Sequence, residues 1–111
     1  MKAILIDVIN QRIKYVDVKG EEISNFIGNG CELTDSPFAY PNGDMLYCDK
    51  DGYENKQIGG FYYPSWLLPI TGNAIIVGKS GDCKSSLADI EINLRFVPRA
   101  AMEIFKKSIT V

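Results

Sequence analysis

The 111-residue sequence contains no histidine, and its three cysteines are widely spaced. Without histidine the chain lacks the commonest general base, which excludes the Ser-His-Asp and Cys-His arrangements of nucleophilic catalysis. Cys31, Cys48 and Cys83 form no C-x-x-C pair, so neither a disulfide framework nor a zinc site is predicted. We interpret the cysteines as small buried hydrophobic residues in a reducing cytoplasm. We expect no enzymatic activity, no catalytic residue and no cofactor.

The sequence also lacks a cluster of positive charge and a long apolar run. Twelve basic residues stand against fourteen acidic ones, for a formal charge of −2, and they are scattered apart from Lys106 and Lys107. Phosphate contacts need a clustered basic face, so direct binding to nucleic acid is not expected. No run approaches the roughly 20 apolar residues that span a bilayer, and the opening MKAILIDV is too short for a signal-peptide core. These features predict a cytoplasmic protein without a membrane segment.

Apolar and aromatic residues are densest in the stretch GGFYYPSWLLPITGNAIIVG, residues 59–78. Pro64 and Pro69 forbid a continuous helix there, so we expect an irregular, packed loop in this part. The run from Ala74 to Val77 lies between glycines and predicts a buried strand. The rest of the chain is interpreted as organised around this stretch.

The first half of the chain alternates strand signals with turn signals. Residues 3–8 form a short apolar run that Asp7 interrupts, and residues 12–18 mix apolar with polar side chains. With Asn10 and Gln11 between them, these two segments predict a hairpin whose first strand is interior. A short helix is expected after Gly20, with Gly28 as its C-cap. The next segments are interpreted, in chain order, as a brief strand at 31–33, a loop at 34–44, a strand at 45–48, a turn at 49–52 and a return strand at 53–58.

Two interpretations stay open for residues 87–96. Ile90, Ile92, Leu94 and Phe96 alternate with polar residues, which predicts a strand, whereas Leu87, Ile90 and Leu94 also fit one helical face. Pro98 suits the first position of a terminal helix, whose inward residues would be Met102, Ile104 and Phe105. Residues 1–111 are therefore predicted to form a single α+β domain, with a mainly antiparallel sheet, one or two short helices and a C-terminal helix.

The acidic residues near the predicted turn at 49–52 do not match a metal-binding loop. Asp49-Lys50-Asp51-Gly52 begins like a calcium loop, but an EF-hand needs its glycine at the sixth position and its bidentate glutamate at the twelfth. Here Gly52 is fourth and the twelfth residue is Gly60. We predict no metal site and interpret the segment as a solvated hairpin turn.

The aromatic residues of the 59–78 stretch, with that acidic turn, are the strongest candidates for binding a partner. Tyr and Trp are enriched at the energetic centres of interfaces. Three adjacent aromatic residues cannot all face one way on a strand, so Tyr62 is expected to face outward if Phe61 and Tyr63 face the core. The predicted partner-binding residues are Tyr62, Trp66, Asp49, Asp51 and Glu54; the alternative is that most of the aromatic residues are core.

A polar segment, KSGDCKSS, follows Gly78 and is the candidate site for a small ligand. It contains neither G-x-G-x-x-G nor the spacing of a P-loop lysine. Its lysines and hydroxyls could still bind an anion beside a helix N-terminus. The ligand-binding residues of this alternative are Lys79, Ser80, Lys84 and Ser85.

The order of these features resembles a family of small uncharacterised proteins encoded by phages and other mobile elements. The matching parts are MKAILID with a following Asn, the helix ending in IGN, the strand DMLYCDKDG and the segment LPITGNAIIVGKSGD, over most of residues 1–95. The family carries no assigned activity. The resemblance therefore implies no activity or catalytic residue for this chain, and it implies mainly a mobile-element origin. Small acidic proteins of that origin often occupy a surface of a host defence complex, as anti-CRISPR proteins do.

Three hypotheses for function follow. The first is a non-enzymatic protein-binding module that inhibits a host defence protein. The second is a small-molecule binder that sequesters a nucleotide signal between the aromatic residues and the 79–86 loop. The third is a homo-oligomer, such as a homodimer, in which the exposed aromatic residues are buried by a second copy.

Overall fold

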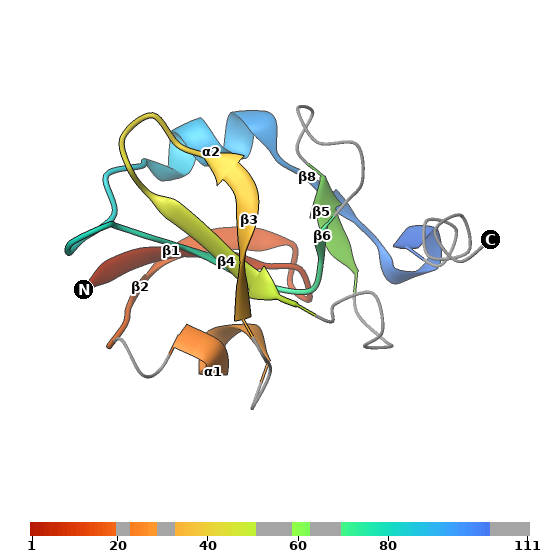
Figure 1. Ribbon diagram of the computed structural model, residues 1–111. Helices are drawn as coiled ribbons and strands as arrows, with labels where there is room; N and C mark the ends of the chain where they lie inside the picture. The colour runs from red at the N-terminus through yellow and green to blue at the C-terminus, as the bar shows by residue number, and fades with distance from the viewer. Residues whose placement is uncertain (20–22, 29–32, 51–58, 63–69, 103–111) are drawn as a thin grey trace.

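The computed structural model describes residues 1–19, 23–28, 33–50, 59–62 and 70–102, with the backbone alone for 33–39. These residues form a small α+β domain with two antiparallel sheets (Figure 1). The larger sheet has five strands in the order β2-β1-β7-β4-β3. Its strands are β1 Lys2–Asp7, β2 Arg12–Asp17, β3 Leu33–Ala39, β4 Met45–Asp49 and β7 Ala74–Val77. The smaller sheet has the order β6-β5-β8, with β5 Gly60–Tyr62, β6 Ile70–Thr71 and β8 Arg95–Val97.

Strands β1 and β7 are buried on both faces because a helix covers each side of the larger sheet. In Figure 1, α2 (Leu87–Asn93) lies above this sheet and α1 (Ile23–Ile27) lies below it. All four residues of β7 are buried, and so are the residues of β1 from Ala3 to Asp7. The predicted hairpin of the first two strands and the predicted buried strand at Ala74–Val77 are therefore confirmed.

The alternation of side chains along these strands divides the core into two clusters. The cluster under α2 joins Ile90 of that helix to residues of β1, β4, β5 and β7, namely Ile4, Ile6, Leu46, Phe61, Ala74 and Ile76. The cluster over α1 contains Ala3, Val18, Ile27, Ile75 and Val77. Because successive strand residues point to opposite faces, each central strand contributes to both clusters.

The turn between β1 and β2 is fixed by Asp7. One carboxylate oxygen accepts hydrogen bonds from the backbone amides of Ile9 and Asn10, both at 3.1 Å, and the other accepts one from the Asn10 side chain at 2.8 Å. Burial alone would raise the pKa of Asp7, but the hydrogen bonds from Asn10 and Ile9 and the charge of Arg12 outweigh it, so the pKa is lowered. Gln11 adopts a left-handed φ of 53°. The turn thereby sets the register of the hairpin.

Residues 87–93 form helix α2, so the strand predicted for the alternating residues is wrong there. Ser86 caps the helix, and its hydroxyl oxygen accepts from the Asp89 amide at 3.2 Å. Ile90 packs inward and Ile92 is 79% exposed, as one helical face requires. The strand is limited to β8, whose Phe96 pairs with Phe61 of β5. The alternative interpretation, in which Leu87, Ile90 and Leu94 share one helical face, is confirmed because all three pack in or against the same core cluster.

Two further segments differ from the predicted loops. Strand β3 covers Leu33–Ala39, including Pro37, because an edge strand with a register shift between Asp35 and Ala39 tolerates proline. Strands β5 and β6 lie within the stretch expected to be irregular. A Cβ atom on Gly60 would overlap the carbonyl oxygen of Ile70, so glycine permits their close approach.

The C-terminal helix begins after Pro98 and is described as far as Met102. The Met102 amide donates to the Pro98 carbonyl at 3.0 Å, and the Met102 side chain is fully buried, as predicted. Ile104, Phe105 and the predicted return strand at 53–58 lie outside the described residues. Within the described ranges, no helix is both long enough and apolar enough to cross a bilayer.

Candidate functional site

The structure places two of the five predicted partner-binding residues. Tyr62 ends β5 in the smaller sheet and is half-buried, while the adjacent Phe61 is fully buried. Asp49 ends β4 in the larger sheet and is also half-buried. Trp66, Asp51 and Glu54 lie outside the described residues. The proposed joint surface of aromatic and acidic residues therefore stays a prediction.

The loop of residues 78–86, which connects β7 to α2, brings together most of the residues assigned to the alternative ligand site. Lys79, Ser80 and Lys84 are exposed. They line a hollow of about 340 Å³, here called the loop hollow, whose other lining residues are Asn42, Gly43, Asp44, Gly81 and Asp82. A Cβ atom on Gly78 would overlap the backbone of Asp82, so glycine is needed where the loop folds back on itself. Three of the four residues of the alternative ligand site therefore line one hollow, and ligand binding there stays a prediction.

Ser85, the fourth of these residues, is instead bound to Asp44. Both groups are buried, and the Ser85 hydroxyl and amide donate to one Asp44 carboxylate oxygen at 2.7 and 2.8 Å. The Lys84 amide donates to the two oxygens at 3.0 and 3.1 Å. The Asn42 side chain donates to the Ser85 hydroxyl oxygen at 3.0 Å. The Ser85 hydroxyl, one of the groups predicted to bind an external anion, thus binds an internal carboxylate instead.

A second hollow lies next to the first and was not predicted from the sequence. It measures about 400 Å³ and is lined by Met1, Lys2, Tyr15, Val16, Asp17 and Asp82. Asp82 lines both hollows, so the two are neighbours. We call the five residues Met1, Lys2, Tyr15, Asp17 and Asp82 the N-terminal surface.

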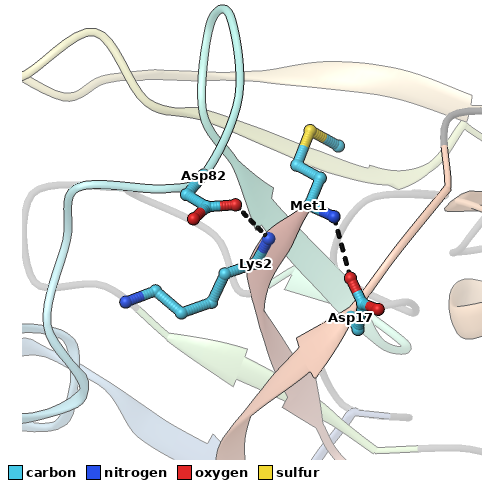
Figure 2. Close-up of polar contacts among 4 residues, drawn as sticks. All are labelled: Met1, Lys2, Asp17 and Asp82. Atoms are coloured by element: carbon cyan, nitrogen blue, oxygen red, sulfur yellow. Dashed lines mark hydrogen bonds and ion pairs between the residues drawn. The ribbon is translucent and has the colours of Figure 1, made fainter.

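Polar contacts hold the N-terminal surface together, as Figure 2 shows. The Met1 ammonium donates to Asp17 at 2.8 Å, and the Lys2 amide donates to the Asp82 carboxylate at 2.6 Å. The Cys83 amide donates to the Lys2 carbonyl at 2.8 Å, which ties the 78–86 loop to β1. The hydrogen bond between the Met1 ammonium and the Asp17 carboxylate raises the pKa of the ammonium and lowers the pKa of the carboxyl group.

Tyr15 is the aromatic residue of this surface. Its side chain is 42% exposed, and the Lys2 ammonium lies 4.7 Å from the centre of its ring. This is the geometry of a cation–π contact. The sequence carried a weak signal for it, because Tyr15 occupies an alternating position in a hairpin strand. Nothing in the sequence indicated that Asp82, from a loop far along the chain, would lie beside it.

The described cysteines, Cys48 and Cys83, have buried side chains. Both are reduced thiols that form no disulfide. Burial, with a smaller contribution from the Asp44 charge, raises the pKa of the Cys83 thiol, which disfavours the reactive thiolate. This agrees with the interpretation of these two cysteines as structural residues. Among the described residues, no group of three or more acidic, cysteine or histidine side chains could hold a metal ion.

No protein-family model, curated protein or solved structure gives a significant match to the chain. The resemblance to phage proteins therefore stays a prediction from short motifs.

Proposed function

We propose that the protein is a non-catalytic protein-binding module that contacts its partner through the N-terminal surface. The observation that supports this most is the exposure of Tyr15, with a lysine ammonium over its ring and charged groups around it. Tyrosine is enriched at the centres of interfaces because it offers a large apolar area with a polar end. The surrounding charges of Lys2, Asp17 and Asp82 supply the polar rim that such interfaces have.

The loop hollow favours protein binding over the sequestering of a nucleotide. Its lysines, Lys79 and Lys84, stand against two carboxylates, Asp44 and Asp82. A phosphate group entering the hollow would meet these negative charges, and the nearest amides already donate to Asp44. The ring that would stack on a base, Trp66, lies outside the described residues. The nucleotide hypothesis therefore stands as the second outcome of the experiment.

The class of partner comes from the resemblance to phage and mobile-element proteins. From this resemblance we expect the target to be a host defence protein, which the chain would inhibit by occupying a surface of it. A homodimer is the third outcome, in which a second copy would cover Tyr15.

The experiment is capture of partners from host lysate by the tagged protein, with mass spectrometry of bound proteins and of small molecules released on heating. We compare the wild type with Tyr15→Ala and use Ile92→Ala as the control, because Ile92 is exposed on α2 and is not among the residues that line the hollow of the N-terminal surface. Wild type and control should retain one stoichiometric protein, which is then purified to measure affinity. Tyr15→Ala should weaken binding by about 30-fold, as the loss of an interface centre does.

Each other outcome contradicts the proposal. Equal binding by wild type and Tyr15→Ala would move the interface elsewhere. A released nucleotide without a protein partner would support the sequestering hypothesis. Light scattering of the purified protein tests the homodimer hypothesis by measuring the mass of the particle in solution. A stable dimer that dissociates in Tyr15→Ala would identify the partner as a second copy and would overturn a host protein as the target.

A further inference from the structure

We propose that the partner adds a β-strand to the outer edge of β2, and that this strand alternates acidic and apolar residues. The inference rests on the proposed function and specifies its chemistry. Strand addition requires a sheet edge with unpaired backbone groups and a matching pattern of side chains. Within the described part of the chain, the β2 edge has both.

The unpaired groups are identified by the hydrogen-bond pattern between β1 and β2. The Val18 amide donates to the Met1 carbonyl at 2.8 Å, so Val18 and Met1 form a hydrogen-bonded pair. Because such pairs alternate in an antiparallel ladder, the backbone groups of Arg12, Lys14 and Val16 point to β1, and those of the residues between them point away. The outward groups belong to Ile13, Tyr15 and Asp17.

Contacts of β1 agree with this pattern. The amide and carbonyl of Lys2, which pairs with Asp17, bind Asp82 and Cys83 on the side away from β2. Strand β2 ends the larger sheet, and no described segment hydrogen-bonds the outward groups of its three residues. The edge is thus a row of backbone donors and acceptors.

The two edges of the sheet are built differently. Strand β3, at the opposite edge, carries Pro37 and a register shift, which are devices that prevent further pairing. Strand β2 contains neither proline nor glycine, and its register runs without a shift from Lys2 opposite Asp17 to Asp7 opposite Arg12. Only the β2 edge, of the two, is a regular template for an incoming strand.

The side chains of β2 define what the incoming strand should contain. Arg12 and Lys14 lie on one face with Val16, and Ile13 and Tyr15 lie on the other with Asp17. An incoming strand would place alternate residues beside the two cations and beside the two apolar side chains. Opposite charges stabilise cross-strand pairs, so acidic residues fit the first face and apolar residues the second. A second copy fits less well because its own Arg12 and Lys14 would add like charge.

The test uses a capped peptide of about eight residues, the length of an ordinary strand, in which Glu and Val alternate. It is titrated into the ¹⁵N-labelled full-length protein, with a matched Lys-Val peptide as the control. We expect the largest shifts, and slowed hydrogen exchange, at the amides of Ile13, Tyr15 and Asp17. The double variant Arg12→Glu with Lys14→Glu should bind the Glu-Val peptide about tenfold more weakly and prefer the Lys-Val peptide.

A second variant separates backbone pairing from side-chain contact. Tyr15→Pro removes an outward amide that β1 does not use, whereas Tyr15→Ala removes the ring alone. Strand addition predicts a larger loss of peptide binding for Tyr15→Pro than for Tyr15→Ala. If Tyr15→Pro does not fold, the charge-reversed variant decides the question.

The inference is overturned by the absence of peptide binding at about 1 mM, by shifts confined to Lys79 and Lys84, or by a dimer whose outward β2 amides are already protected. These results leave the proposed function intact if the wild type captures a protein partner from the lysate and Tyr15→Ala does not. Conversely, lysate capture that yields no protein partner overturns the proposed function whatever the peptide shows.

Discussion

Asp44 connects the two parts of the chain that enclose the loop hollow. Its buried carboxylate accepts from the Lys84 amide, the Ser85 amide and the Ser85 hydroxyl. Replacing it with alanine would leave these donors without their acceptor, at a position where both Asp44 and Ser85 are buried. We expect Asp44→Ala to lower the free energy of unfolding by about 3 kcal/mol, since both unmade bonds and desolvated donors contribute.

Urea unfolding of the purified variant checks this, with Ser80→Ala as the matched control. Ser80 is exposed in the same loop, so its replacement should change the free energy of unfolding by less than about 0.5 kcal/mol. A similar small effect for Asp44→Ala would mean that the donors find water, and that the hollow is open to an external anion after all.

Sequence reasoning found the residues of this site that are neighbours in the chain and missed those that folding brings together. Lys79, Ser80 and Lys84 share one loop, so their proximity could be predicted. The bond from Ser85 to Asp44 joins residues 41 positions apart, and that from Lys2 to Asp82 joins residues 80 apart. The carboxylates that accept hydrogen bonds from this loop are brought to it by the order of β4, β7 and β1 in the sheet. No local sequence pattern specifies that order.

At the scale of elements, helix α2 shows how one pattern fits two structures. An alternation of apolar residues and a helical face of Leu87, Ile90 and Leu94 are both present. The helix forms because Ser86 caps its first turn and because β1 and β7 already fill the sheet positions beneath it. The two structures make opposite predictions for Ile90 and Ile92.

In the helix, Ile90 is buried and Ile92 is exposed, whereas on a strand both would share a face. We therefore expect Ile90→Ala to lower the free energy of unfolding by about 3 kcal/mol, through lost burial and a cavity under α2. Ile92→Ala should change it by less than about 0.5 kcal/mol. Thermal or urea unfolding of the two variants makes the comparison, and equal losses would place both side chains in the core.

Strand β3 forms where the local sequence predicts a loop. Prolines and an Asn-Gly pair predicted a loop for residues 34–44, yet Leu33–Ala39 pairs with β4. Tertiary pairing overrides local propensity at a sheet edge, because one side of an edge strand needs no donors. The strongly periodic strands β1, β2 and β7 were predictable for the opposite reason, since burial selects their side chains directly.

At the scale of the whole molecule, the two sheets share one core. Phe61 of the smaller sheet is fully buried and belongs to the same cluster as Ile4, Ile6 and Leu46 of the larger one. The smaller sheet lies beside the larger one, on the side opposite the N-terminus in Figure 1. The N-terminal surface and the β2 edge therefore belong to a sheet that shares its core with the smaller sheet.

This arrangement predicts that Phe61→Ala destabilises both sheets together. Removing a fully buried phenylalanine should lower the free energy of unfolding by about 4 kcal/mol. If the sheets form one cooperative unit, hydrogen exchange in Phe61→Ala should lose protection equally at the amides of β1 and of β5. Loss confined to β5 and β8 would instead show that the smaller sheet unfolds by itself. The larger sheet, with its β2 edge and N-terminal surface, would then bind partners independently of its neighbour.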